Sequence, residues 1–234
     1  MPPTIADFTE QLKLIRALRK DFGPDMPIVD TFFDPFQQVL RKAGFSTAKL
    51  IYGNRREALH MLDAITETVC GYLQALKKTG CDAVLYSING AITPAGDRGI
   101  DDETFKTFLR PFDLRVCEAM QGMTRILHVH GIHIDMRRVL DYPVEVFSVS
   151  DRLAGNPSLG ELRKMTDKCL MDGINEQKTA ERSLPEIRAE MQDAVRQAGK
   201  RKLMLTPGCT SAPQTPEHIL RCVRETSREF ARSA

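Results

Sequence analysis

Three side chains that bind zinc well lie at the ends of two apolar runs in this chain of 234 residues. His128 and His130 end the run at residues 125–131, and Cys209 ends the run at residues 202–209. Ligands bind at the carboxyl ends of strands in parallel α/β folds, so residues far apart in sequence can meet there. Two imidazoles and one thiolate would leave the fourth position of a tetrahedral zinc ion open, as in catalytic zinc sites.

An alternative interpretation of these three residues needs no metal. His128 and His130 are two residues apart, so on a strand their side chains share one face. Without a metal, His128 would be a core histidine with satisfied hydrogen bonds, and His130 would cap a loop. Cys209 would be a small buried hydrophobic residue. The residues alone leave both interpretations open.

Other polar residues follow two further predicted strands. Asp151 and Arg152 follow one of them, where the planar guanidinium could bind a carboxylated ligand or form an internal pair that fixes the loop. Asn175 and Glu176 follow the next, where they could orient a ligand, support a zinc-bound histidine or cap a helix. Asp151 and Glu176 are the carboxylates predicted to serve as a catalytic acid. Further candidates for contacts with a substrate are Ser87, Asn89 and Asn156.

Apolar runs of strand length alternate with amphipathic helical patterns along the whole sequence. This alternation predicts an α/β fold in which helices cover a parallel sheet. No linker or low-complexity segment interrupts it, so we expect one domain over residues 1–234. A complete (β/α)8 barrel has eight strands and typically about 250 residues, so six predicted βα units indicate an incomplete, TIM-barrel-like fold. The predicted strands are 26–33, 83–88, 125–130, 144–149, 170–174 and 202–206, and the predicted helices are 4–22, 35–43, 55–79, 101–121, 134–141, 158–168, 184–198 and 215–232.

The composition argues against several classes of protein. A net charge of +2, with four Tyr and no Trp, gives no indication of nucleic-acid binding. No apolar run approaches the roughly 18 residues of a membrane span, and residues 1–10 lack the pattern of a signal peptide. The six cysteines are dispersed without a CxxC pair, which predicts reduced thiols in a cytoplasmic protein.

Seven motifs occur along the chain in the order seen in a known family. Together they resemble the uroporphyrinogen decarboxylase superfamily, which includes zinc-dependent cobamide methyltransferases. The motifs are Ile28 to Phe36, Ala83 to Gly90, Phe105 to Phe112, His128 to Gly131, Ser148 to Arg152 with Gly155 to Leu159, Leu170 to Glu176, and Thr206 to Cys209 with Pro213 and Thr215 to Glu217.

The resemblance implies a barrel of the uroporphyrinogen decarboxylase type and three competing functions. The first is zinc-assisted methyl transfer from a methyl-corrinoid, carried by a corrinoid protein, to a small thiol. The second is decarboxylation of a tetrapyrrole, uroporphyrinogen III, in porphyrin and heme biosynthesis. The third is a non-catalytic remnant that binds a ligand or partner.

This chain departs from the family pattern in three places. His130 stands where the methyltransferases carry the Cys of His-x-Cys, and imidazole is still a good zinc ligand. Cys209 stands where decarboxylases carry His. The N-terminal portion of the family, which in decarboxylases supplies an Arg-rich segment and the catalytic Asp, has no counterpart here.

Six strands would leave two sheet edges, so we expect a homodimer or a chain that needs a partner.

Overall fold

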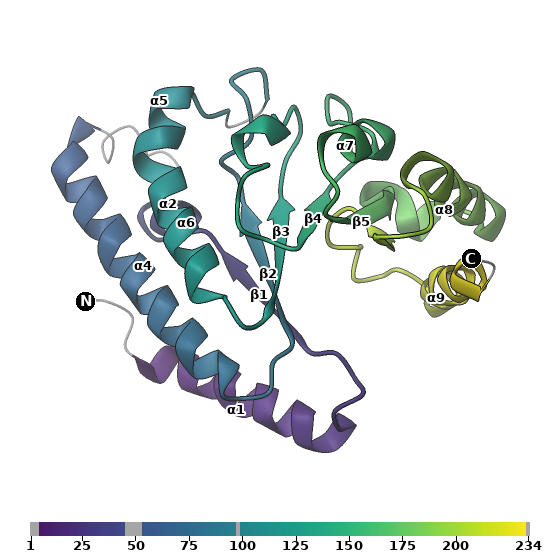
Figure 1. Ribbon diagram of the computed structural model, residues 1–234, viewed down its shortest axis with the longest axis horizontal. Coiled ribbons are helices and arrows are strands. Elements are labelled where there is room, and N and C mark those ends of the chain that lie inside the picture. Colours follow the sequence, from purple (N-terminus) through teal and green to yellow (C-terminus); the bar gives the residue numbers. More distant parts are fainter. Residues whose placement is uncertain (1–4, 45–52, 97–98, 233–234) are drawn as a thin grey trace. The chain divides into compact units, whose positions relative to one another are not determined.

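The computed structural model describes residues 5–44, 53–96 and 99–232 and contains a six-stranded sheet (Figure 1). The strand order follows the chain from β1 to β6, and the paired strands run parallel. This arrangement confirms the predicted parallel α/β class. The strands are β1 (Val29–Phe33), β2 (Ala83–Ile88), β3 (Thr124–Val129), β4 (Val146–Val149), β5 (Cys169–Ile174) and β6 (Leu203–Pro207).

Helices separate the strands, and several begin at the residues that the sequence indicates. Capping boxes start α7 at Ser158 and α8 at Ser183, where a Glu three residues later bonds back to the cap. The main helices are α1 (Ile5–Phe22), α2 (Pro35–Ala43), α4 (Arg55–Lys77), α6 (Arg110–Ala119), α7 (Leu159–Met165), α8 (Leu184–Ala198) and α9 (Glu217–Arg232), and the short turns are α5 (Asp102–Thr104), the π-helix η2 (Phe105–Leu109), and the 3-10 helices η3 (Met136–Arg138) and η4 (Glu176–Glu181).

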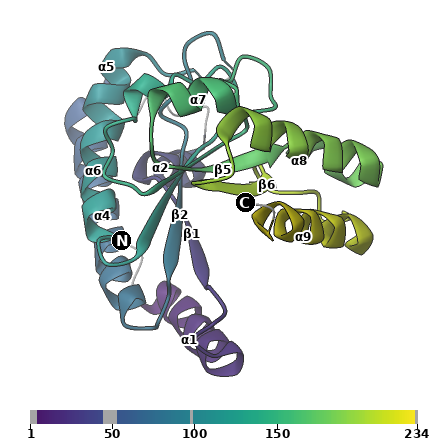
Figure 2. The ribbon, with the colours of Figure 1, turned by 45° about the vertical axis from the view of Figure 1, so that its right-hand side comes forward.

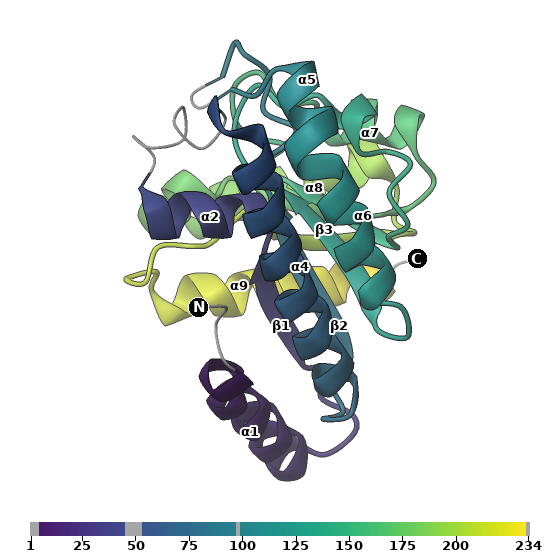
Figure 3. The same cartoon turned by 90° about the vertical axis from the view of Figure 1, so that its left-hand side faces the viewer.

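The chain forms two compact units, and each has its own packing. In the first, α4 and α6 run side by side (Figure 3). The buried Tyr72 hydroxyl donates to Asp30 over 2.7 Å, and the hydroxyls of Tyr86 and Tyr142 donate to the two oxygens of Asp113. The single-domain expectation stays a prediction. The first unit comprises residues 1–90, 100–127 and 142–144, and the second comprises residues 91–99, 128–141 and 145–234.

The second unit holds the predicted zinc ligands. Its helices α8 and α9 lie beside β5 and β6 (Figure 2). Their apolar faces enclose a cluster that includes Ile174 at the end of β5 and Leu205 of β6. The fully or nearly fully buried members of this cluster are Ile174, Ile187, Met191 and Ile219, with Leu205, Val223 and Phe230 packed against them.

The prediction of a helix at 134–141 is wrong, because this segment is held in other pairings. Ile134 forms an antiparallel bridge with Ile92, and Asp135 donates its backbone N–H to the carbonyl of Ala91 over 2.8 Å. The Asp135 carboxylate then accepts the backbone N–H of Arg137, a local bond that competes with helix formation. One 3-10 turn is all that forms there.

The predicted helix at 101–121 is present but interrupted. The backbone N–H of Arg110 bonds to the carbonyl of Phe105, five residues earlier, in the π-helical turn η2. Pro111 follows and has no N–H to donate, so the regular pattern could not continue through it. Among the described helices, none is long and apolar enough to cross a membrane.

Candidate metal centre

His128 lies on β3 with one ring nitrogen engaged and the other free. It is buried, and Nδ1 lies 3.1 Å from the Ser148 Oγ of β4. Nε2 is also buried and has no hydrogen-bond partner among the described residues. A buried polar atom without a partner calls for an explanation, such as an ion.

His130 and Cys209 complete a cluster with His128. The Cys209 Sγ lies 3.6 Å from the His130 Nδ1. One ligand atom from each of the three residues lies within 4.8 Å of the others. Ideal tetrahedral zinc with ordinary Zn–S and Zn–N lengths separates sulfur from nitrogen by about 3.5 Å, so the Cys209–His130 distance suits a shared metal. The structure therefore brings together the three residues that the sequence singles out.

The surroundings of Cys209 favour its thiolate. Hydrogen bonding from the His128 ring is the main cause that lowers the pKa of the thiol, and burial opposes it. The positive charge that His128 can carry and a hydrogen bond from the Thr210 backbone lower it further. Thiolate is the form that binds metal.

The residues present fit a zinc ion. The unpartnered Nε2 of His128, the exposed His130 and a thiol disposed to ionise supply two nitrogens and one sulfur. Such a set leaves one coordination position for a substrate. In the described part of the chain, no other group of three or more His, Cys, Asp and Glu side chains has metal-binding geometry.

Gly208 determines how the Cys209 turn sits against its neighbours. Its backbone N–H donates to the carbonyl of Ile174 over 3.0 Å, which continues the β5–β6 pairing. A Cβ at this position would lie 2.7 Å from Ser150 Cα and 3.1 Å from the Glu176 Oε2. Only glycine fits there without a shift, so the Thr206-to-Cys209 motif has a steric reason for its glycine.

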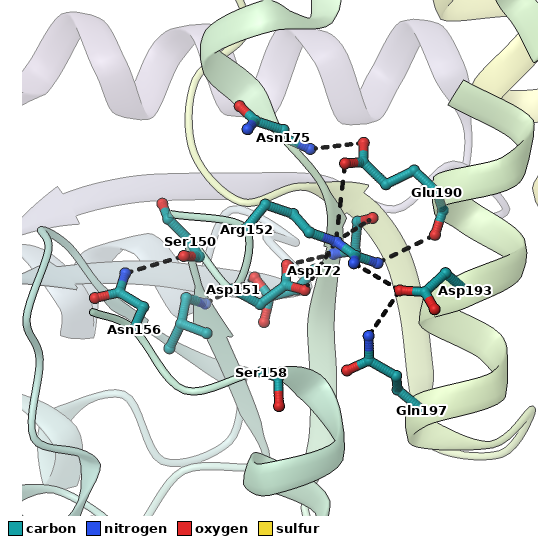
Figure 4. Close-up of polar contacts among 12 residues, drawn as sticks. Ser150, Asp151, Arg152, Asn156, Ser158, Asp172, Asn175, Glu190, Asp193 and Gln197 are labelled. Carbon is teal, nitrogen blue, oxygen red and sulfur yellow. Dashed lines mark hydrogen bonds and ion pairs between the residues drawn. The ribbon is translucent and has the colours of Figure 1, made fainter. Parts of the chain in front are cut away.

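Arg152 is engaged within the protein (Figure 4). Its Nη1 donates to the Asp193 carboxylate over 2.7 Å, and its Nη2 donates to the backbone carbonyl of Glu190, both on α8. Its Nε donates to the carbonyl of Gly173 and lies 3.1 Å from an Asp151 oxygen. The structure therefore favours the internal role that the sequence left open over contact with a ligand.

Asp151 is a buried carboxyl beside this guanidinium. It accepts the backbone N–H of Gly173 over 3.0 Å. Burial raises its pKa to about 6, although the charge of Arg152 acts in the opposite direction. Behind it, Asp172 accepts the backbone N–H of Val149, and burial raises the pKa of Asp172 well above its ordinary value. Glu176 is buried as well, and its Oε2 has no hydrogen-bond partner among the described residues.

Both asparagines of this face hold backbone in place. The Asn156 amide donates to the carbonyls of Gly131 and Ser150 over 2.8 and 2.9 Å. The Asn175 side chain accepts the backbone N–H of Gln177 and begins η4. These contacts match capping and loop-closing roles, and none of the contacts described for these two residues points to a ligand.

Ser87 and Asn89 lie in the other unit, at the end of β2. The carbonyl of Ser87 accepts the backbone N–H of Asp34, and the Asn89 N–H donates to the Asp34 carboxylate over 3.2 Å. Asp34 caps α2 by accepting the Gln37 N–H, and burial raises its pKa to about 6. The sequence analysis missed Asp34, although an Asp just before a helical Pro is an N-cap signal.

Comparison with known proteins gives one family match and several similar folds. The model of the family described as uroporphyrinogen decarboxylase (URO-D) matches residues 2–230. A methyltransferase from Methanosarcina mazei is similar with a TM-score of 0.80 and 21% identity, over 94% of this chain and 63% of its own. A B12-independent methionine synthase from a Shewanella species has a TM-score of 0.64 and 14% identity, over 95% of this chain and 66% of its own.

This chain therefore spans less than two thirds of the length of both proteins. At these identities, the likeness is one of fold. Comparison with curated proteins finds no match.

Proposed function

The chain belongs to the uroporphyrinogen decarboxylase family, and we propose that it uses zinc held by His128, His130 and Cys209 to methylate a thiol from a methyl-corrinoid. The observation that carries the proposal is the convergence of these three side chains, whose ligand atoms lie within 4.8 Å of one another. The fold shared with a methyltransferase supports the reaction class. The choice of a thiol as methyl acceptor and of a corrinoid as methyl donor are both parts of this proposal.

Each residue of the cluster has a distinct task in this reaction. His128 would bind through Nε2, because its Nδ1 faces Ser148. His130 is exposed and Cys209 is partly exposed, so they border the side from which a substrate would enter. Zinc, when bound there, lowers the pKa of a coordinated thiol and keeps a nucleophile available at neutral pH. In the transfer, the carbon–sulfur bond forms as the carbon–cobalt bond breaks, and the electron pair stays with cobalt.

Metal analysis of the purified protein tests the metal site. We expect about one zinc per chain, lost in Cys209→Ala and retained in Cys70→Ala. Cys70 is a suitable control because it is partly buried like Cys209 and lies on α4 in the other unit. A zinc-free wild-type protein that does not take up added zinc would contradict the proposal.

The reaction is tested with methylcobalamin and a panel of small thiols. We expect the corrinoid to lose its methyl group only when zinc, thiol and protein are all present. The change in its visible absorption measures this loss. Cys209→Ala should abolish it, and Cys70→Ala should not. Zinc binding with no transfer to any thiol would leave the metal site in place and refute the methyltransferase assignment.

A further inference from the structure

A buried hydroxyl group lies behind the innermost ligand of the proposed zinc site. We propose that Ser148 is a positioning residue that holds His128 in the Nδ1–H tautomer, with Nε2 directed at the metal. This inference rests on the proposed function in one respect, since zinc is the group that His128 would serve.

The contact that carries the inference joins two buried side chains on neighbouring strand ends of the same unit. Ser148 Oγ lies 3.1 Å from His128 Nδ1, and the two residues are 3% and 5% exposed. At this depth water does not compete for the ring nitrogen, so the hydroxyl group is the partner that Nδ1 has. Metal-bound histidines generally donate their other N–H to a neighbouring oxygen acceptor, which fixes the tautomer and the ring orientation.

Metal binding requires one of the two tautomers. If Nε2 carried the proton, its acceptor would be the Cys209 sulfur, whose pKa the His128 ring lowers, and Nε2 would have no lone pair for a metal. If Nδ1 carries the proton, it donates to Ser148 Oγ and the lone pair of Nε2 is available. Neutral imidazole in water favours the opposite tautomer, with the proton on Nε2, so the protein must supply the preference.

The strand that carries Ser148 is fixed from its other side. β4 pairs with β5 at Val146 and Phe147, and the backbone N–H of Val149, the residue after Ser148, donates to the buried Asp172 carboxyl over 2.8 Å. The Asp172 side chain thus extends the hydrogen bonding of β4 past its last ladder pair. The hydroxyl of Ser148 therefore sits on a rigid element, as a group that orients a ligand should.

Nitrogen-15 NMR of the metal-free protein tests the tautomer without any zinc. Two-bond proton–nitrogen correlations of labelled histidine distinguish a protonated Nδ1 from a protonated Nε2. We expect His128 in the Nδ1–H form in the wild type and a shift toward Nε2–H in Ser148→Ala. An Nε2–H tautomer in the wild type, or no change in Ser148→Ala, would overturn the inference.

Zinc affinity, measured by competition with a chromophoric chelator, gives the second test. We expect Ser148→Ala to bind zinc about 10- to 100-fold more weakly, the usual effect of removing such a partner. Thr66→Ala is the control: this residue is also buried, its hydroxyl also donates one hydrogen bond, to the carbonyl of Leu62, and it lies on α4 in the other unit. Equal weakening in both variants would indicate a general packing effect and refute the role of Ser148.

A second pair of variants guards against a misfolded alanine variant. Ser148→Thr and Ser148→Val have the same shape and differ in the hydroxyl group, so the pair isolates the hydrogen bond. We expect Thr to keep both the tautomer and the affinity and Val to lose both. A wild-type protein that shows the Nδ1–H tautomer but binds no zinc would refute the proposed function and leave the hydrogen bond established. A zinc-binding wild type with the wrong tautomer would refute this inference alone.

Discussion

The thiol of Cys209 differs from those of Cys70, Cys81 and Cys169 in the direction of its pKa shift. Burial raises the pKa of the thiols on both helices and strands, whereas the imidazole of His128 lowers that of Cys209. A low pKa in a partly exposed thiol is the condition for reactivity. The thiols with raised pKa are Cys70, Cys81 and Cys169.

We expect the metal-free Cys209 to be alkylated at lower pH than an ordinary cysteine. A lowered pKa means that the reactive thiolate is already present below the usual midpoint of about 8.5, so the rate should rise with pH through a lower midpoint. His128→Ala should move that midpoint upward, because it removes the main cause of the shift.

Iodoacetamide labelling, followed by mass spectrometry of the Cys209 peptide across pH, measures this. His218→Ala is the control, since His218 is an exposed histidine of α9. Added zinc should slow the labelling of Cys209 and leave that of Cys70 unchanged. A midpoint at or above that of a free cysteine in the wild type would show that His128 does not lower the pKa of Cys209.

Gly208→Ala should destabilise the protein although it adds a single methyl group. The new Cβ would lie 2.7 Å from Ser150 Cα and 2.9 Å from the Val149 carbonyl oxygen, both backbone atoms that cannot turn aside. Overpacking of this kind costs about 1–3 kcal/mol. Urea unfolding should show the loss, and Gly71→Ala is the control.

Gly71 lies in the middle of α4 with nothing within 4 Å of a new Cβ. An alanine there should stabilise the helix by about 0.5–1 kcal/mol. Gly208→Ala should therefore lower the free energy of unfolding, and Gly71→Ala should raise it. Equal stability of Gly208→Ala and the wild type would mean that the turn before Cys209 is not tightly packed.

At the scale of elements, Arg152 joins the loop after β4 to β5 and α8. One guanidinium donates to a carboxylate of α8, to a carbonyl of α8 and to a carbonyl of β5. The rigid fork of Arg serves three acceptors at once, which the single ammonium group of Lys could not match. This clamp pairs with Asp151, the residue after Ser150, and the Cys209 turn is packed against Ser150.

Arg152→Met should therefore cost about 3 kcal/mol, since it leaves buried carboxylates without their cation. Arg196→Met is a matched control, because Arg196 bonds to the same Asp193 but is 65% exposed. An exposed pair of that kind contributes at most about 1 kcal/mol. Denaturant midpoints of the two variants measure the difference, and similar losses would argue against a clamp at Arg152.

Sequence patterns predicted the helices and strands that have regular local signals. They failed for segments whose backbone conformation is determined by residues far away in the sequence. α2, β2 and α8 begin and end at the residues expected from apolar spacing, proline and glycine. Residues 134–141 have helical spacing too, but the bridge from Ile134 to Ile92 holds their backbone. No local pattern reports a partner 42 residues away.

The same distinction applies to the candidate site. His128, His130 and Cys209 were predictable because residue type and strand-end position together suggest a metal site. An internal role of Arg152 was one of two alternatives, but its partner Asp193 could not be predicted, since it is 41 residues distant on another helix. Ser148 was not either, because serine on a strand has no distinctive pattern and its importance comes from the neighbouring ring.

At the scale of the whole molecule, we expect no decarboxylation of uroporphyrinogen III. That substrate carries several carboxylates, which need cationic partners, and the guanidinium of Arg152 already serves internal acceptors. The acid candidate Asp151 is likewise held by Gly173 and Arg152. Chromatography of products against an active decarboxylase should show no coproporphyrinogen above the enzyme-free level. A clear yield would mean that Asp151 or Glu176 supplies the acid after all.

The strand at the start of the sheet bears on assembly. Among the described strands, β1 pairs with β2 alone, and its side chains alternate between exposed and buried. Val29 and Phe33 are 46% and 38% exposed, although both are large and apolar. An unpaired strand edge with exposed apolar side chains favours pairing with another chain.

We therefore expect a homodimer in which the edge of β1 lies in the interface. Val29→Lys should weaken dimerisation at least about tenfold, because it places a charge where an apolar contact forms and charged edges resist pairing. Met61→Lys is the control, since Met61 is a similarly exposed apolar residue (37%) on α4. Light scattering coupled to gel filtration over a range of concentrations measures the equilibrium. A folded wild-type monomer at micromolar concentration would refute the dimer, and a dimer that Val29→Lys does not weaken would place the interface elsewhere.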